Sequence, residues 1–233
     1  MMFWSSGSGL TFNHPLKLIP WYKRPCGGAS MWMIDSGVKA EPPPIEKLLN
    51  SQIMWADVAV CPDILGDAHG TIARTREWFP QIKERKPAAK TVVCTQGTDA
   101  ERMKIMDTFP DADWYGAGLN QDGDKKAFTD AERERILRWL VPEIHARGKR
   151  VHIFGIGCRM PQLELFVELG VDSFDSSTVV LIAAHGKALN GDLKQIHMTY
   201  GGTADDKRKL VDLSLRNIDL ALKRLNDRKA MLF

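Results

Sequence analysis

The sequence predicts a compact (β/α)8 TIM-type barrel, and two observations carry that prediction. Short apolar, β-rich runs alternate with helix-like segments along most of the 233 residues, which favours a parallel sheet. Four of these runs are followed directly by an acid or an amide, namely Asp35, Asp63, Gln96 and Asp175. Because barrels carry their chemistry at the carboxyl ends of their strands, these four side chains are expected to share one pocket.

Each element follows from its local pattern. Strands are expected over the apolar runs 30–34, 57–61, 91–94, 113–117, 151–157 and 171–174, with 194–199 as the last strand. Helices are expected over 42–55, after a proline-rich entry, and over 68–84, 98–107, 130–147, 160–169 and 204–228. Thr129 and Glu132 form a capping box that opens the helix at 130, and Gly148 ends that helix.

The chain reads as a single domain over 1–233. It shows no internal repeat, low-complexity tract or linker, and 204–228 is a basic, amphipathic C-terminal helix. The segment 1–29 is rich in Gly, Pro and Trp and is expected to be irregular. These features fit a barrel at the lean end of the size range of the fold.

Composition indicates an ordinary soluble protein. Charged residues make up 26% and hydrophobic residues 44% of the chain, and the net charge of +3 neither demands nor excludes a nucleic-acid partner. No apolar run reaches the ~18 residues of a membrane span, and the N-terminus lacks a signal-peptide pattern. A cytoplasmic location is expected, in the host cytoplasm if a phage encodes the chain. Cys26, Cys61, Cys94 and Cys158 are far apart, which favours reduced thiols over a metal site or a disulfide.

Asp175 and Asp35 are the candidate catalytic carboxylates. Asp175 lies in GVDSFDSS, where a carboxylate can attack an electrophilic sugar carbon and form a covalent intermediate. Asp-Ser-Ser is also a good helix cap. Asp35 lies in the tight turn IDSG, which suits either an acid aimed into a pocket or a plain turn residue. Two carboxylates facing one pocket can divide the work between nucleophile and general acid/base.

A second set of residues suits a flat, purine-like ligand. The carboxylate of Asp63 can accept two N–H donors from a guanine-like edge, and Gln96 offers both a donor and an acceptor. Gly116 and Gly118 allow close approach of the backbone to such a ligand. A helix cap, a loop amide and a simple turn are the alternative interpretations of these residues.

The order of the strand-end motifs along the chain matches that of a known family. IDSG, AVCPD, TQG and GAGL precede the block HIFGIGCRMPQLELFVELGVDSFDSS at 152–177. Over roughly residues 30–190 the chain resembles the tRNA-guanine transglycosylase superfamily, whose β/α barrels exchange guanine for a 7-deazaguanine base. The resemblance implies that Asp175 is the nucleophile that attacks C1′ of the target nucleoside and that Asp35 is the general acid/base. It also implies that the base is held by Asp63, Gln96, Gly118, Phe154 and Gly155. The implied reaction needs no cofactor and no metal.

Three departures from the family pattern bear on the substrate. The family's zinc module, a CxCxxC with a later histidine, is absent. IDSG continues as Val38-Lys39 where the family commonly has a second glycine and a stacking aromatic, so either another aromatic stacks on the base or the pocket is looser. The tryptophans are expected mostly in the core or on helix faces, with Trp21, Trp32 and Trp114 as the ones that could reach a base plane. The basic loop after the nucleophile is reduced to AAHGKALNG, with His185 and Lys187.

These departures resemble the DNA-modifying branch of phage or bacterial DNA-guanine transglycosylases, which insert 7-deazaguanines such as preQ0 into DNA. A duplex substrate requires flipping the guanine out of the stack. The expected nucleic-acid contacts are His185, Lys187, Lys207 and Arg208, although aspartates dilute the charge of the terminal helix. Members of the family often form dimers, so a homodimer is an expectation.

Other functions remain open at this point. A minimal tRNA-guanine transglycosylase is the nearest alternative. A catalytically silent nucleic-acid-binding subunit is another, although it has no need of both Asp35 and Asp175. An unrelated barrel glycosidase or nucleosidase also uses paired carboxylates, but it would have no use for purine-edge readers at Asp63 and Gln96.

Overall fold

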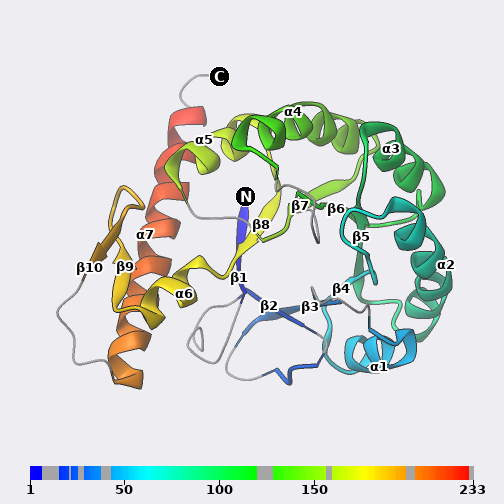
Figure 1. Cartoon of the computed structure of the whole chain (residues 1–233), viewed down its shortest axis with the longest axis horizontal. Helices are drawn as coiled ribbons and strands as arrows, with labels where there is room; N and C mark the ends of the chain where they lie inside the picture. Colours follow the sequence, from blue (N-terminus) through cyan, green and yellow to red (C-terminus); the bar gives the residue numbers. More distant parts are fainter. Residues whose placement is uncertain are drawn as a thin grey trace.

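The computed structural model describes residues 1–6, 16–20, 22–25, 29–37, 43–119, 128–155, 159–197 and 203–230. Eight parallel strands form a closed barrel in chain order (Figure 1). These strands are β1 Met2–Ser6, β2 Leu16–Pro20, β3 Met31–Asp35, β4 Val58–Val60, β5 Lys90–Thr95, β6 Trp114–Ala117, β7 Arg150–Ile153 and β8 Ser173–Ser176. The predicted TIM-type fold is therefore confirmed.

Helices connect the strands from β3 onward and form the outer layer of the barrel (Figure 1). They are α1 Ile45–Trp55, α2 Ala68–Arg85, α3 Asp99–Thr108, α4 Asp130–Ala146 and α5 Met160–Leu169. After β8 come α6 Thr178–Ala184, an antiparallel hairpin of β9 Lys187–Leu189 and β10 Gln195–His197, and α7 Ala204–Ala230. The last helix packs against α5, α6 and β9. No helix of the described ranges is long and apolar enough to cross a membrane.

Two expectations from the sequence are wrong. The segment 1–29 is not irregular throughout, because residues 2–6 and 16–20 form β1 and β2, and β1 pairs with β8 to close the barrel. The run 194–199 does not supply the last barrel strand, because β10 pairs only with β9 in the separate hairpin. In both places pairing with distant strands decides the structure, and local pattern reports that poorly.

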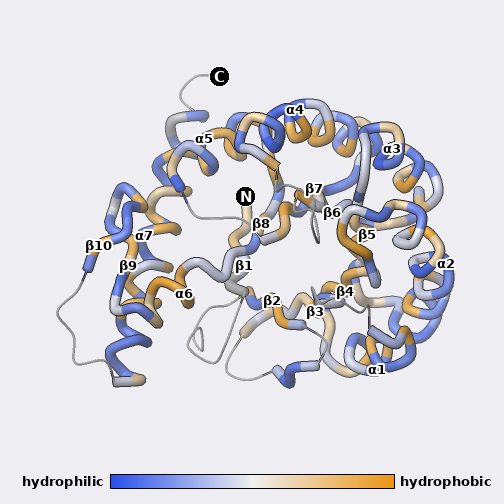
Figure 2. The backbone as a smooth tube through the Cα atoms, viewed as in Figure 1, coloured by the Kyte–Doolittle hydropathy of each residue, from blue (hydrophilic) through white to orange (hydrophobic). Residues whose placement is uncertain are grey.

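The distribution of apolar residues explains why the barrel strands lie inside a layer of helices. The strands β4 and β5 are apolar on both faces because helices cover them outside and side chains fill the barrel inside. Figure 2 shows these strands as hydrophobic, with hydrophilic residues on the outer sides of α2 and α3. The predicted capping box of Thr129 and Glu132 is present at the start of α4. A second capping box, formed by Thr98 and Glu101, starts α3.

One arc of the barrel has no helical cover among the described residues. No helix lies between β1 and β2 or between β2 and β3 in those ranges. The Lys17 side chain is only 3% exposed there, and its ammonium lies 5.2 Å from the centre of the Trp32 ring. Leu18 lines the interior cavity, so Lys17, its neighbour along the strand, faces the outside of the barrel.

Candidate active site

A cavity of about 180 Å³ lies inside the barrel where the strands end. It is smaller than the ~300–1,000 Å³ of pockets that enclose drug-sized ligands, so it suits a single flat ring system. Its lining includes the seven residues to which the family resemblance gives a catalytic or base-binding role, and it does not include Gly116; the seven are Asp35, Asp63, Gln96, Gly118, Phe154, Gly155 and Asp175. The apolar side chains of Leu18, Leu65 and Leu119 and the thiol of Cys94 complete the wall.

Asp175 is a buried carboxylate held by two donors. It lies on β8 with only 4% of its surface exposed. Its Oδ1 accepts a hydrogen bond from the backbone N–H of Gly155 at 3.0 Å and lies 3.3 Å from Nε2 of His152. Nδ1 of His152 lies 2.9 Å from the Ser173 hydroxyl oxygen. When that hydroxyl donates to Nδ1, Nε2 carries the proton and donates to the carboxylate.

Asp172, the other acid of the GVDSFDSS block, has a different position. It immediately precedes β8 and accepts a hydrogen bond from the backbone N–H of Val151 at 2.9 Å. It also pairs with His145 at 3.0 Å. Since β7 and β8 begin here, Asp172 lies at the end of the barrel opposite the cavity. Its bond to Val151 links the start of β8 to β7.

Asp35 ends β3 and is a carboxyl group with a strongly perturbed pKa. Burial raises its pKa to about 7, with further contributions from the charges of Asp63 and Asp175. Backbone N–H groups of Gly37 and Ser36 oppose the shift without cancelling it. A group with such a pKa exchanges protons readily near neutral pH, as a general acid/base must.

Asp63 is tied to its neighbours through both carboxylate oxygens. The Ser36 hydroxyl donates to Oδ1 at 2.9 Å, and the Gln96 amide donates to Oδ2 at 2.7 Å. The same hydroxyl lies 3.4 Å from Oδ1 of Asp35, so it connects the two acids. Burial raises the pKa of Asp63, and the bonds from Ser36 and Gln96 oppose that rise.

Gln96 and Gly118 form a flat wall of the cavity. A Cβ added at Gly118 would lie 2.5 Å from both terminal atoms of the Gln96 side chain. The glycine therefore allows the amide to lie directly against the backbone. The Gln96 carbonyl oxygen also accepts from the Gly66 N–H at 3.3 Å, which fixes the amide plane at both ends.

Arg102, which the sequence interpretation did not single out, braces this wall from behind. It is 1% exposed, and its guanidinium donates to the carbonyl oxygens of Thr95 at 2.7 Å, Gly97 at 3.1 Å and Gly118 at 2.8 Å. Burial lowers its pKa to about 10, which leaves it charged at neutral pH. No motif indicates this role, because the three acceptors are backbone atoms.

Phe154 is the aromatic residue that the described part of the cavity offers to a base. Its ring lies where a Cβ at Gly116 would be, 2.3 Å away, and it meets the His152 ring edge-on with centroids 4.4 Å apart. Trp32 and Trp114 do not line the cavity, so the alternative in which they reach the base plane does not hold. Trp21 lies outside the described residues.

The predicted basic contacts lie away from this cavity. His185 ends α6, Lys187 begins β9, and Lys207 and Arg208 belong to the first turns of α7. Arg208 pairs with Asp205 at 3.2 Å. The structure thus gathers all seven predicted catalytic and base-binding residues and leaves these four outside the cavity.

The described residues contain no cluster of three or more His, Cys, Asp or Glu side chains that could hold a metal ion. Cys61 and Cys94 are buried free thiols, and the backbone N–H of Cys94 donates to Cys61 Sγ at 3.2 Å. Cys26 and Cys158 lie outside the described residues.

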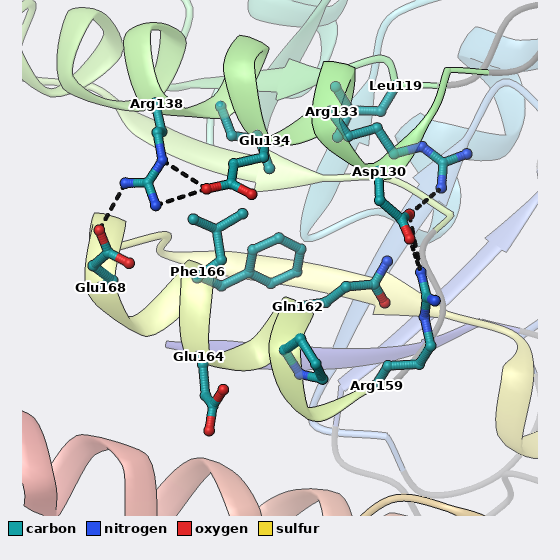
Figure 3. Close-up of a pocket in the computed structure, with 13 residues that line it drawn as sticks. Leu119, Asp130, Arg133, Glu134, Arg138, Arg159, Gln162, Glu164, Phe166 and Glu168 are labelled. Atoms are coloured by element: carbon teal, nitrogen blue, oxygen red, sulfur yellow. Dashed lines mark hydrogen bonds and ion pairs between the residues drawn. The ribbon is translucent and has the colours of Figure 1, made fainter.

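A larger groove of about 380 Å³ lies between α4 and α5 (Figure 3). Most of its charged side chains pair with one another. Arg138 bridges Glu134 and Glu168, at 2.8 and 2.7 Å, and Arg159 meets Asp130 at 2.9 Å. Because most of its charges are paired, this groove is a poorer site for chemistry than the smaller cavity inside the barrel.

Comparisons with known proteins identify the fold and no more. No protein-family model matches the chain, and no curated protein matches its sequence. The YdjI aldolase from Escherichia coli K12 superimposes with a TM-score of 0.54 and 10% identity, covering 96% of this chain and 89% of that chain. A structure assigned as a fructose-1,6-biphosphate aldolase from Coccidioides immitis gives 0.51 and 13% identity, covering 84% and 70%. At such identities the likeness shows the barrel fold alone.

Proposed function

We propose that this chain is a DNA-guanine transglycosylase that exchanges guanine in DNA for a 7-deazaguanine base such as preQ0. The observation that carries the proposal is the joint presence, around one small cavity, of two carboxyl groups and a hydrogen-bonded Asp63–Gln96 pair. The carboxyl groups suit glycosyl transfer, and the pair suits a purine edge. The described lining contains no lysine, the residue that forms Schiff bases with carbonyl substrates.

The geometry supports a two-step exchange. Asp175 Oδ1 is held by Gly155 and His152, so Oδ2 is the oxygen that attacks C1′ as the bond from C1′ to guanine N9 breaks. Asp35, protonated in part near neutral pH, donates a proton to the departing base. The incoming base then attacks C1′ through N9, the ester to Asp175 breaks, and the N9 proton passes to Asp35. The exchange is redox-neutral.

The burial of Asp175 bears on how a polymer could bind. A carboxylate with 4% exposure inside a 180 Å³ cavity cannot reach a base that stays stacked in a duplex. The target nucleotide must therefore leave the stack, at a cost of a few kcal/mol. DNA is proposed over tRNA because the sequence contains no CxCxxC motif. In the family that this chain resembles, that motif belongs to the zinc module that helps to hold tRNA.

The test is exchange of labelled guanine or preQ0 into duplex DNA and tRNA, offered separately to the wild type, to Asp175→Asn and to Asp192→Asn. The last variant is a control that changes an exposed carboxylate of the β9–β10 hairpin. We expect label to enter DNA with the wild type and the control only, and a covalent adduct on a denaturing gel that Asp175→Asn lacks. Label in tRNA alone would replace DNA by RNA as substrate. Full activity of Asp175→Asn would refute the mechanism.

A further inference from the structure

A groove of about 620 Å³ runs along the outside of the barrel, between α1 and residues 22–24 of the connection that follows β2. It is separate from the catalytic cavity, and no described residue lines both. Figure 1 shows α1 and the β2–β3 side of the barrel next to each other. The groove therefore adjoins the arc of the barrel where the described residues form no covering helix.

Exposed apolar side chains collect in this groove. Five large hydrophobic side chains stand exposed in the described part of the chain. Three of them line the groove, and they are Tyr22 at 46%, Met54 at 65% and Trp55 at 42% exposure. Single exposed apolar residues are ordinary, but a cluster with two aromatic rings marks an interaction surface.

The charged residues that line the groove are all basic. Lys23, Arg24 and Lys47 are exposed and line it, and none of the described lining residues is acidic. The acid next in sequence, Glu46, is engaged by Arg85 at 3.3 Å. On α7, by contrast, Arg208 pairs with Asp205 at 3.2 Å and Lys209 with Asp206 at 3.9 Å. Among the described residues, the groove therefore gathers three exposed cations with no acidic residue in its lining, whereas the first turns of α7 mix cations with aspartates.

One end of the groove lies beside the end of β3 that carries Asp35. Pro20, two residues before Tyr22, pairs in register with Asp35. The Tyr22 ring lies 3.2 Å from where a Cβ at Gly37 would be, and Gly37 follows Asp35 by two residues. A polymer that delivers a nucleotide to Asp35 therefore passes close to Tyr22.

We infer that this groove binds the DNA strand that flanks the target nucleotide. The inference rests on the proposed function and adds the surface on which that substrate lies. Lys23, Arg24 and Lys47 would contact successive phosphates, and Tyr22 and Trp55 would stack against bases or sugars. Cations interleaved with aromatic rings are the combination by which proteins hold unpaired nucleic-acid strands without reading their sequence.

The experiment measures binding of a fluorescein-labelled DNA by anisotropy across a salt series, with no exchange required. The first variant is Lys23→Glu/Arg24→Glu/Lys47→Glu, and its matched control, Lys207→Glu/Arg208→Glu/Lys209→Glu, makes the same change in net charge on α7. We expect the groove variant to lose at least about 100-fold in affinity and its salt slope to fall by about 3. The α7 control should lose clearly less.

A second variant, Tyr22→Ala/Trp55→Ala, separates stacking from charge. Both side chains are exposed, so the fold should survive, as circular dichroism would verify. We expect a loss of roughly 10-fold or more in DNA affinity with the salt slope unchanged.

The outcomes distinguish the groove from the enzyme activity. If the wild type exchanges bases but the groove variants bind DNA as well as the α7 control does, the inference that DNA binds in the groove is overturned. The proposed activity is then unaffected. Groove-dependent DNA binding without any exchange would retain the groove and remove the proposed function. Sedimentation that shows a dimer lost in Tyr22→Ala/Trp55→Ala, with DNA binding intact, would assign the groove to a second copy of the chain and overturn the inference.

Discussion

Replacing Asp35 by Asn should make the protein more stable, and increasingly so as the pH rises. The folded pKa is about 7 and the ordinary value is 3.8, so the folded state holds this proton more tightly than the unfolded state. The wild type therefore carries no penalty below pH 3.8, a growing penalty between the two values, and the full penalty above pH 7. With ~1.36 kcal/mol per pH unit, the penalty is at most about 1.7 kcal/mol at pH 5 and about 4 kcal/mol at pH 8.

The assay is urea unfolding of wild type and Asp35→Asn at pH 5 and pH 8, with Asp192→Asn as the control on an exposed turn. The stability gain of Asp35→Asn should be about 2–3 kcal/mol larger at pH 8 than at pH 5, and the control should show no such trend. A gain that is the same at both pH values would show that Asp35 titrates normally in the fold. The general acid/base role would then lose its physical basis.

Three further predictions concern the walls of the cavity. Gly118→Ala places a methyl group 2.5 Å from the Gln96 amide and should raise the KM for the base about 10-fold, with kcat nearly unchanged, in steady-state exchange; a lower kcat at constant KM would contradict this. His152→Ala removes one of two donors to Asp175 and should slow adduct formation about 10- to 100-fold, the equivalent of roughly 1.5–3 kcal/mol for a hydrogen bond to a charged group; a single-turnover rate equal to wild type would exclude that role. Arg102→Leu removes a donor from the carbonyl oxygens of Thr95, Gly97 and Gly118, of which Thr95 keeps the backbone N–H of Gly118 at 3.2 Å, and should cost roughly 2 kcal/mol or more in urea unfolding; a cost below about 1 kcal/mol would show that the loops close without it.

The sequence predicts the barrel and its cavity because both depend on local pattern. An acid or amide directly after an apolar run marks the strand ends at Asp35, Asp63, Gln96 and Asp175 in the sequence. A closed parallel sheet then brings these strand ends together. Helix starts such as Thr129 are readable for the same reason, since a capping box is a contact within four residues.

What the sequence does not predict depends on distant contacts. β1 and β2 are short and carry no strong alternation, and their place is set by pairing with β8 and β3. The contact of His152 with Asp175 joins neighbouring strands through inward side chains, and Arg102 binds mainly backbone oxygens. Each depends on which side chains face inward at a given register, and a one-residue shift of a strand would reverse that direction.

The pairing of β1 with β8 has a consequence for how the protein folds. Met2 lies opposite Ser173 and Trp4 opposite Asp175, so the strand that carries the candidate nucleophile is completed by the opposite end of the chain. Contacts of such long sequence separation form slowly, because the loop between them must first be closed. During refolding, the helical content and the β3–β7 arc can form before Asp175 reaches its final position. Recovery of activity should therefore lag behind recovery of the helical circular dichroism signal.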